Sequence, residues 1–534
     1  MFYPDMRRPF FLVALALLGG VALLTRYAPS SAWAYVLLVP VCMVGVHDSL
    51  QTKRAVLRNF PVIGHFRYLF EAVRPELNQY FVESDIDGRP FSREMRSLVY
   101  QRAKRELDTV PFGTKGDVYE VGYEWLNHSL APREVSHEPP RVPIGEKTCA
   151  RPYRASLLNI SAMSFGALSK NAILALNMGA RIGGFFHNTG EGGVSSYHLE
   201  GGGDLVWQIG TGYFGCRGED GRFDAERFAE QASHENIKMI EVKLSQGAKP
   251  GHGGILPAKK LTLEIARIRG VPMGKDVLSP AAHTAFTTPV EMMLFLARLR
   301  ELSGGKPVGL KLCVGKRREF LALCKAMVET GHHPDYIAID GGEGGTGAAP
   351  LEFTTSVGTP LDEGLVFVHN CLVGMNLRDR VKVIASGRIT TGFGMVKRVA
   401  MGADICNTAR GMMMALGCIQ ALRCNSNHCP VGVATQDPGL TEGLIVTDKK
   451  QRVANFQAST VHAFLELVAA AGLRGPHELR PWHVERRVSP TEVRHYAQLF
   501  EYLSPGQLLT GPLPKGYARA YGAARADTFE AQDD

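Results

Sequence analysis

Short apolar runs alternate with helical patterns along most of the chain after residue 150. The runs occupy 156–160, 183–188, 239–244, 308–314, 336–340, 381–385 and 404–407. Each leads into a stretch with helical periodicity, which is typical of parallel strands joined by helices. These seven runs, with an eighth strand expected between residues 354 and 376, predict an α/β fold, a (β/α)8 TIM barrel with insertions. A doubly wound open sheet is the alternative.

The first fifty residues have another pattern, with two charge-free apolar runs at 10–24 and 32–46. Each run is shorter than the roughly 20 residues of a spanning helix, although flanking residues extend both. Basic residues flank the pair of runs: Arg7, Arg8, Lys53, Arg54 and Arg58. The positive-inside rule then predicts a transmembrane helical hairpin in the cell inner membrane, with the main domain cytoplasmic. A cleaved signal peptide and a hairpin buried in a soluble fold are the alternatives.

These sequence patterns divide the chain into four parts. Residues 1–50 form the predicted membrane hairpin, and 51–147 read as a connecting module broken by prolines. Residues 148–445 hold the predicted barrel. Residues 446–534 are expected to form a helical extension and a tail.

Composition narrows the possible functions. With 45% hydrophobic and 21% charged residues among 534, the chain is expected to be globular. Ten cysteines, mostly scattered singly, are too dilute for a disulfide-rich secreted domain and favour a reducing compartment. The net charge of +8 is not gathered into blocks, so no nucleic acid partner is expected.

Glycine-rich loops follow the last predicted strands. They read DGGEGGTGAAP at 340–350, SGRITTG at 386–392 and TARG at 408–411. Free backbone N–H groups in a loop that leads into a helix favour binding of an anion. In (β/α)8 barrels, phosphate groups are often bound by the loops that follow the last strands. We therefore predict a phosphate-bearing cofactor there. The full dinucleotide fingerprint is missing, so no nicotinamide site is assigned.

Two further loops carry candidate chemistry. SAMSFGALS at 161–169 offers small residues against which a flat ring could lie, and KLSQGAKPGHGG at 243–254 carries Lys243 and Lys249. These lysines could be solvated surface charges. At the functional end of a barrel, however, a lysine that leaves an apolar strand favours a role in binding or catalysis.

Three cysteines lie within CIQALRCNSNHCPVGVATQ, residues 418–436. A cytoplasmic chain does not need a disulfide, and the short intervals let thiolates converge on a metal. Zinc with His428 as an added ligand and three unrelated buried cysteines are the alternatives.

SAMSFG, KLSQGAKPG, DGGEGGTGAAP, ASGRITTG and ALGCIQALRCNSNHCPVGVATQ resemble successive blocks of the FMN-binding synthase domain of glutamate synthase. The similarity runs from about residue 151 to 438, and the whole chain is similar to the short membrane-anchored bacterial proteins of that family. The resemblance implies a (β/α)8 barrel that binds FMN, and a 3Fe–4S cluster on Cys418, Cys424 and Cys429. It also implies reduction of 2-iminoglutarate, formed from 2-oxoglutarate and ammonia, to glutamate.

The resemblance assigns residues to roles. Lys243, Gln208 and Lys249 would touch the flavin or the substrate, Lys249 through a substrate carboxylate. The cofactor would be held by Ala162, Met163, Ser164, Gln208, Lys243, Gly344, Gly345, Ser386, Gly387, Arg388, Ala409 and Arg410.

Some residues depart from the family pattern. Where the family usually has PGEGGQLPG, this chain has PGHGGILPA, so His252 and Ile255 replace an acidic and a polar residue expected near the substrate. No glutamine-hydrolysing domain or nicotinamide motif is recognised. This implies that ammonia arrives free or from a partner, and that the electron donor is external, such as a ferredoxin or a dehydrogenase subunit. A membrane-associated flavin and Fe–S oxidoreductase acting on a different substrate, and an electron-transfer subunit, are the alternatives.

Overall fold

The computed structural model describes residues 6–136 and 138–530. The chain separates into two compact units, Met1–Gly88 and Arg89–Asp534. The segment 51–147, expected as a connecting module, contributes to both units.

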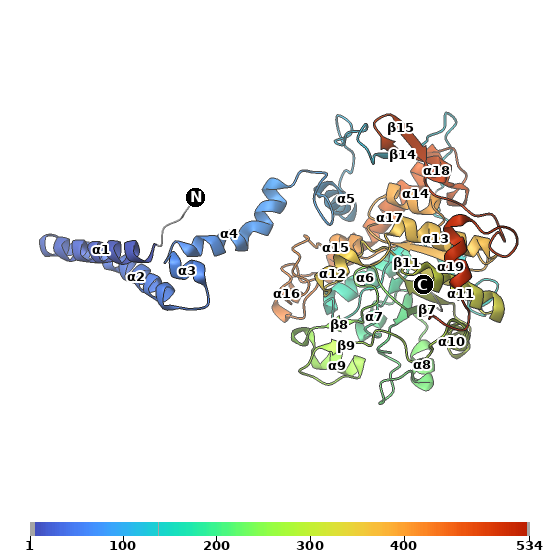
Figure 1. Cartoon of the computed structure of the whole chain (residues 1–534), viewed down its shortest axis with the longest axis horizontal. Coiled ribbons are helices and arrows are strands. Elements are labelled where there is room, and N and C mark those ends of the chain that lie inside the picture. The colour runs from blue at the N-terminus through green and yellow to red at the C-terminus, as the bar shows by residue number, and fades with distance from the viewer. Residues whose placement is uncertain (1–5, 137, 531–534) are drawn as a thin grey trace. The chain divides into compact units, whose positions relative to one another are not determined.

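The N-terminal unit is helical (Figure 1). Its elements are α1 (Arg7–Tyr27), the short helix η1 (Pro29–Trp33), α2 (Ala34–Leu50), α3 (Ala55–Asn59), α4 (Gly64–Leu77) and η2 (Asn78–Val82). The helices α1 and α2 pack against each other as a helical hairpin. A side chain at Gly45 would collide with the ring of Phe10, so glycine lets the two helices approach closely. Two stretches, Arg7–Tyr27 and Pro29–Leu50, are long and apolar enough to cross a membrane, and 0% and 6% of their most apolar windows are buried.

The second unit is built around a closed barrel of eight parallel strands in the order β10-β11-β12-β13-β4-β5-β6-β7. The strands are β4 (Leu158–Ile160), β5 (His187–Asn188), β6 (Leu205–Ile209), β7 (Ile237–Lys243), β10 (Val308–Leu312), β11 (Tyr336–Asp340), β12 (Lys382–Ser386) and β13 (Ile405–Thr408). The predicted barrel is therefore confirmed, and the open sheet is excluded.

The predicted place of the eighth strand is wrong. The missing strand is β6, with the sequence LVWQI, while residues 354–376 contain α12 (Leu351–Ser356) and α13 (Leu361–Gly374). Ten of the fourteen residues of α13 are buried, and so are all five of β6. A short apolar run is compatible with a buried strand and with a buried helix, because periodicity cannot distinguish the two when nearly every position is apolar.

Helices cover the barrel, and smaller sheets extend it (Figure 1). The remaining helices are α5 (Arg93–Lys104), α6 (Lys170–Gly183), α7 (Ser196–Glu200), α8 (Ala225–Ala232), η3 (Ala258–Lys260), α9 (Leu263–Arg269), α10 (Pro289–Leu302), α11 (Arg317–Thr330), α14 (Gly392–Ala400), α15 (Arg410–Ala415), α16 (Pro438–Glu442), α17 (Val446–Ala470), η4 (Pro476–Glu478), η5 (Pro481–His483), α18 (Tyr496–Leu499) and α19 (Lys515–Ala523). The remaining strands are β1 (Glu124–Leu126), β2 (Val142–Ile144), β3 (Tyr153–Ala155), β8 (Ile255–Leu256), β9 (Val277–Leu278), β14 (Val484–Ser489) and β15 (Glu492–His495).

The C-terminal extension is not wholly helical. Its segment 480–496 lies in the part expected to be helical but contains the antiparallel pair β14 and β15, and β14 also pairs with β1. The turn Ser489-Pro490-Thr491 interrupts helical periodicity, because proline removes a backbone donor. The last four residues of the predicted tail lie outside the described residues.

Candidate active site

One cavity opens where the carboxyl ends of the barrel strands meet. It is lined by every residue predicted to be catalytic or to bind the cofactor: Ala162, Met163, Ser164, Gln208, Lys243, Lys249, Gly344, Gly345, Ser386, Gly387, Arg388, Ala409 and Arg410. These residues come from six different loops or strands. Barrel closure brings them together, since parallel strands end at the same rim.

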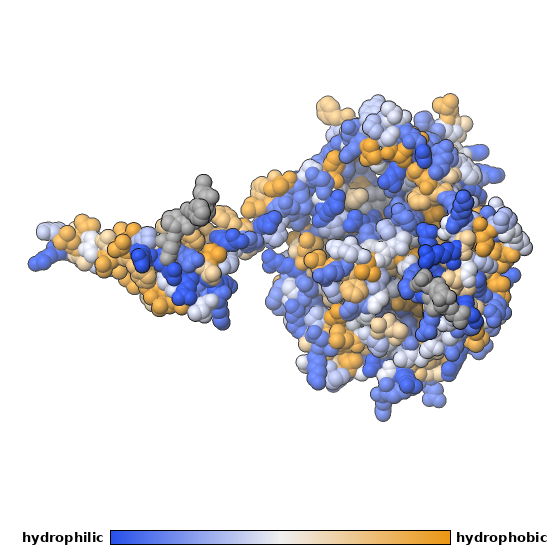
Figure 2. Space-filling view, viewed as in Figure 1, coloured by the Kyte–Doolittle hydropathy of each residue, from blue (hydrophilic) through white to orange (hydrophobic). Residues whose placement is uncertain are grey.

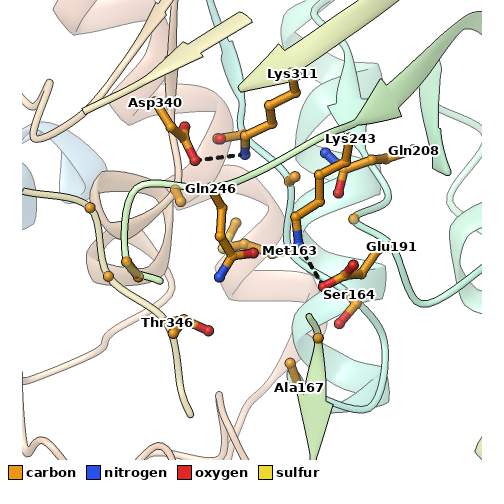
Figure 3. A pocket seen from close by; sticks show the side chains of 18 of the residues that line it. Met163, Ser164, Ala167, Glu191, Gln208, Lys243, Gln246, Lys311, Asp340 and Thr346 are labelled. Carbon is orange, nitrogen blue, oxygen red and sulfur yellow. Dashed lines mark hydrogen bonds and ion pairs between the residues drawn. The ribbon is translucent and has the colours of Figure 1, made fainter. Parts of the chain in front are cut away.

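A buried ion pair joins two walls of this cavity. Lys243, the last residue of β7, places its Nζ 2.6 Å from Oε1 of Glu191, and Figure 3 shows the two side chains meeting. Burial alone would raise the pKa of Glu191, but Lys243, Lys249 and Arg269 outweigh it and hold that pKa below its usual value. Glu191 is therefore an anion that the neighbouring cations fix in place.

A second pair lies beside it on the next strands. Lys311 of β10 places its Nζ 3.1 Å from the Asp340 carboxylate that ends β11 (Figure 3). Burial would lower the pKa of Lys311, yet Asp340 and Glu241 more than compensate, and the pKa lies above its usual value. The two ion pairs thus hold Lys243 and Lys311 each in one orientation.

Glu241 lies two residues before Lys243 and also points into the barrel. Its Oε1 accepts hydrogen bonds from Nδ2 of Asn188 and from Nε2 of Gln208, both at 2.7 Å. Burial raises the pKa of Glu241, although Lys311 opposes the effect. Because Gln208 is tied to this carboxyl group, its amide lies in a fixed position at the cavity wall.

Lys249 differs from the other lysines of the cavity. Its side chain is 2% exposed and makes no hydrogen bond with the described residues. Burial lowers the pKa of Lys249 to about 8; Glu191 opposes this and Lys243 adds to it. A buried ammonium group without a hydrogen-bond acceptor is costly, so the site favours an anionic ligand at this position.

Two arginines lie at the other end of the cavity. Arg388, after β12, has a left-handed backbone with φ of 47°, which is strained for a residue with a side chain. In the described part of the chain its guanidinium has no hydrogen bond or ion pair. The Arg410 guanidinium donates to the Glu343 carbonyl at 3.0 Å and lies 4.8 Å from the centre of the Phe91 ring. This cation pair beside glycine-rich backbone is suited to a phosphate group.

The two departures from the family pattern lie in different surroundings. Ile255, in β8, lines the cavity and offers no hydrogen-bonding group. His252 is not among the lining residues, and its ring packs edge-on against Phe353 at 5.3 Å. Of the two, Ile255 is therefore the one placed to contact a ligand.

The cysteine loop follows α15 and packs against α5. The Cys418 carbonyl accepts a hydrogen bond from the Tyr100 hydroxyl at 2.7 Å, and Cys429 is buried. The pKa of Cys418 is raised to about 11, chiefly by burial and also by the neighbouring Cys424 and Cys429, while a backbone hydrogen bond at Gln420 opposes the shift. Among the described residues, no three His, Cys, Asp or Glu side chains are close enough to hold a metal ion.

Sequence reasoning missed several residues of the cavity. They are Phe91, Glu191, Arg269, Lys311 and Asp340, which line it, and Glu241, which holds the lining residue Gln208. Charged residues inside apolar strands, as in VGLKLCV and MIEVKL, were a usable signal for Lys311 and Glu241. Phe91 and Arg269 had no such signal, because they reach the cavity from segments remote in sequence.

Known proteins resemble this chain over most of its length. A family model described as the conserved region in glutamate synthase matches residues 129–474. The glutamate synthase large subunit-like protein YerD of Bacillus subtilis (strain 168) is 38% identical over 496 residues, which cover 85% of this chain and 94% of that protein.

Longer relatives match the central region. The archaeal glutamate synthase (NADPH) of Methanocaldococcus jannaschii is 35% identical over 322 residues, which cover 60% of either chain. The ferredoxin-dependent glutamate synthase of Antithamnion sp. is 33% identical over 345 residues, 59% of this chain and 21% of that protein. The chain thus matches only part of these two relatives.

The Glu241 hydrogen bonds predict a difference between two substitutions. Glu241→Ala removes the acceptor of two buried amides and should lower the free energy of unfolding by about 3 kcal/mol. Glu241→Gln keeps an acceptor oxygen and should cost less. Urea unfolding followed by circular dichroism measures both, with the exposed Glu329→Ala as control. An alanine variant as stable as this control would contradict the expected role of Glu241.

Proposed function

Because this chain belongs to the glutamate synthase family, we propose that it reduces 2-iminoglutarate, formed from 2-oxoglutarate and ammonia, to glutamate with bound FMN. The observation that carries the proposal is a single cavity that combines a cation pair suited to a phosphate with a buried lysine, Lys249, whose side chain has no carboxylate at hydrogen-bond distance among the described residues. The chain is an oxidoreductase of the class that acts on CH–NH2 groups.

The cavity residues fit FMN. Arg388 and Arg410 would hold the phosphate together with the backbone of Gly387 and Ala409. The small residues 161–164 would face the flavin ring, and Gln208 would reach it with an amide already oriented by Glu241. When bound, reduced FMN supplies the hydride for the reaction.

The lysine side of the cavity would hold the substrate. Lys249, charged below about pH 8, would bind a carboxylate, and Lys243 would keep its position through Glu191. A substrate fixed between these cations meets the flavin in one orientation, which lowers the entropic part of the barrier. The apolar side chain of Ile255 would help to exclude water.

Ile255 also supports a second candidate function. An isoleucine cannot hydrogen-bond a carboxylate, so the same fold and cofactors could serve a substrate with an apolar group at this position. The chain would then be a membrane-associated flavin and Fe–S oxidoreductase on a different substrate. An electron-transfer subunit is less favoured, because Lys249 would have no ligand to bind.

The cysteine loop would hold the 3Fe–4S cluster. Cys418, Cys424 and Cys429 would supply three thiolates from one loop, and Gln420, Leu422 and Asn427 between them have left-handed backbones. Such a strained conformation is retained where the surroundings require it. The cluster would pass single electrons from an external donor, a ferredoxin or a dehydrogenase subunit, to the flavin.

The apolar hairpin would anchor the enzyme in the cell inner membrane, with the barrel in the cytoplasm. Its support is the length and exposure of the two helices and the basic residues that flank them. Ammonia would reach the barrel free or from a partner.

Flavin reoxidation tests the proposed reaction. Anaerobically purified protein is reduced with dithionite, freed of excess reductant and mixed with 2-oxoglutarate, ammonium or both. We expect the flavin to be reoxidised only by the two together, with one glutamate formed per flavin. A flavin that stays reduced would favour another substrate, and Ile255→Gln would then be the first variant to compare.

Lys249 predicts a pH dependence of substrate binding. The charged form is present below about pH 8 and is lost above it, so the KM for 2-oxoglutarate should rise as the pH passes 8. Lys249→Met should raise the KM at least tenfold at pH 7 and flatten this dependence. Steady-state kinetics from pH 6.5 to 9.5 measure both. An unchanged KM in the variant would contradict the role given to Lys249.

The cluster assignment predicts the effect of removing one thiolate. Cys418→Ser should abolish the electron paramagnetic resonance signal of an oxidised 3Fe–4S cluster and lower the iron content. Cys324→Ser, at a buried cysteine in α11, should leave both unchanged. Zinc in place of iron in purified protein would contradict the assignment.

A further inference from the structure

The helix α4 carries one continuous apolar stripe that the described residues of its unit leave largely exposed. Its members, with their exposed fractions, are Ile63 (55%), Phe66 (56%), Leu69 (54%), Phe70 (62%), Val73 (38%) and Leu77 (44%). They recur every three or four residues, so they fall on one side of the helix. The stripe continues into η2 with Tyr80, Phe81 and Val82, each more than half exposed.

Charged side chains border this stripe. Arg67 and Arg74 lie one residue after Phe66 and Val73, and Glu71 pairs with Arg67 at 3.8 Å. Long basic side chains beside an apolar face are typical of helices that lie in a membrane surface, because the charged ends reach the headgroups while the stems stay apolar.

A buried carboxylate ties the start of α4 to the end of α2. Asp48 is 0% exposed and accepts hydrogen bonds from the Val62 N–H at 3.0 Å and from Nε2 of His65 at 2.9 Å. The N-terminal end of α1 lies at the same end of the hairpin, since the Met6 N–H donates to the Asn59 carbonyl at 3.0 Å. The helix α4 therefore begins where the hairpin ends.

These contacts also form an apolar groove between α2 and α4. It is lined by Pro40, Val41, Val44, Val62, His65, Phe66 and Leu69. Figure 2 shows hydrophobic side chains, in orange, spread over this unit. The apolar exposed surface of the hairpin thus continues through the groove to the stripe of α4. Among the groove residues, only His65 is polar.

We propose that α4 lies in the plane of the membrane, with its stripe at the boundary between lipid headgroups and acyl chains, and that Asp48 positions it there. The inference rests on the proposed insertion of α1 and α2. Lipid is the occupant that the charges favour, because Lys53, Arg54 and Arg58 lie between the hairpin and α4 and would meet anionic headgroups. In this position, α4 would hold the chain segment that leads to the barrel at the membrane surface.

Photocrosslinking of the full chain in vesicles tests this placement. Benzoylphenylalanine is introduced at Phe70 on the stripe, at Tyr68 on the polar side as matched control, and at Leu17 in the hairpin. In vesicles of phosphatidylcholine and phosphatidylglycerol we expect lipid adducts at positions 17 and 70 and at least fivefold fewer at 68. Lipid adducts at position 17 together with protein adducts at position 70 would overturn the placement of α4 but leave the proposed anchoring by α1 and α2 intact. A second copy of the chain or the barrel unit would then cover the stripe. No lipid at 17 or 70 would also overturn the anchoring.

The role of Asp48 is tested in the same assay. Asp48→Ala removes the acceptor of the Val62 N–H and of His65, so α4 loses its fixed start. Lipid adducts at position 70 should fall at least threefold while those at position 17 stay unchanged. The exposed Asp87→Ala should change neither. Unchanged adducts at position 70 in Asp48→Ala would show that Asp48 does not position the helix.

Discussion

A buried lysine at the rim of a parallel barrel is costly unless an anion pairs with it, and this constraint organises the candidate site. Lys243 and Lys311 leave neighbouring strands and would be costly to bury alone. Glu191 and Asp340 neutralise them and fix their positions. Among the described lysines that line the cavity, Lys249 is then the one without a carboxylate at hydrogen-bond distance.

The cavity is therefore divided into two chemical ends. Arg388 and Arg410 concentrate positive charge beside bare backbone, which suits a phosphate, while Lys249 lies near the paired lysines, which suits a carboxylate. A flavin that joins the two ends would present its ring between them. Neither end requires movement of the barrel, because strand ends and their first loop residues supply most of the groups.

Sequence patterns predicted the barrel and the loops at its rim for a physical reason, whereas the resemblance to the glutamate synthase domain assigned the individual cavity residues. Parallel strands impose a shared rim, so loops after successive strands must meet. The strand β6 was missed because its five mostly apolar residues, LVWQI, could equally belong to a buried helix. The region of α13 was expected to hold the eighth strand because that helix is also largely apolar and buried. The partner of Lys243 could not be predicted, since Glu191 lies in a loop after a different strand. The hydrogen bonds that Asp48 accepts from the Val62 N–H and from His65 could not be predicted either, because a single carboxylate gives no periodic signal in the sequence.

A titration of flavin-free protein tests the central claim most directly, namely that this cavity binds a flavin through its phosphate. Quenching of flavin fluorescence would be followed with FMN and with riboflavin, which lacks the phosphate. The account predicts that FMN binds at least a hundredfold more tightly than riboflavin, and that Arg388→Ala removes most of this difference. Equal affinities for the two flavins in the unmodified protein would contradict it.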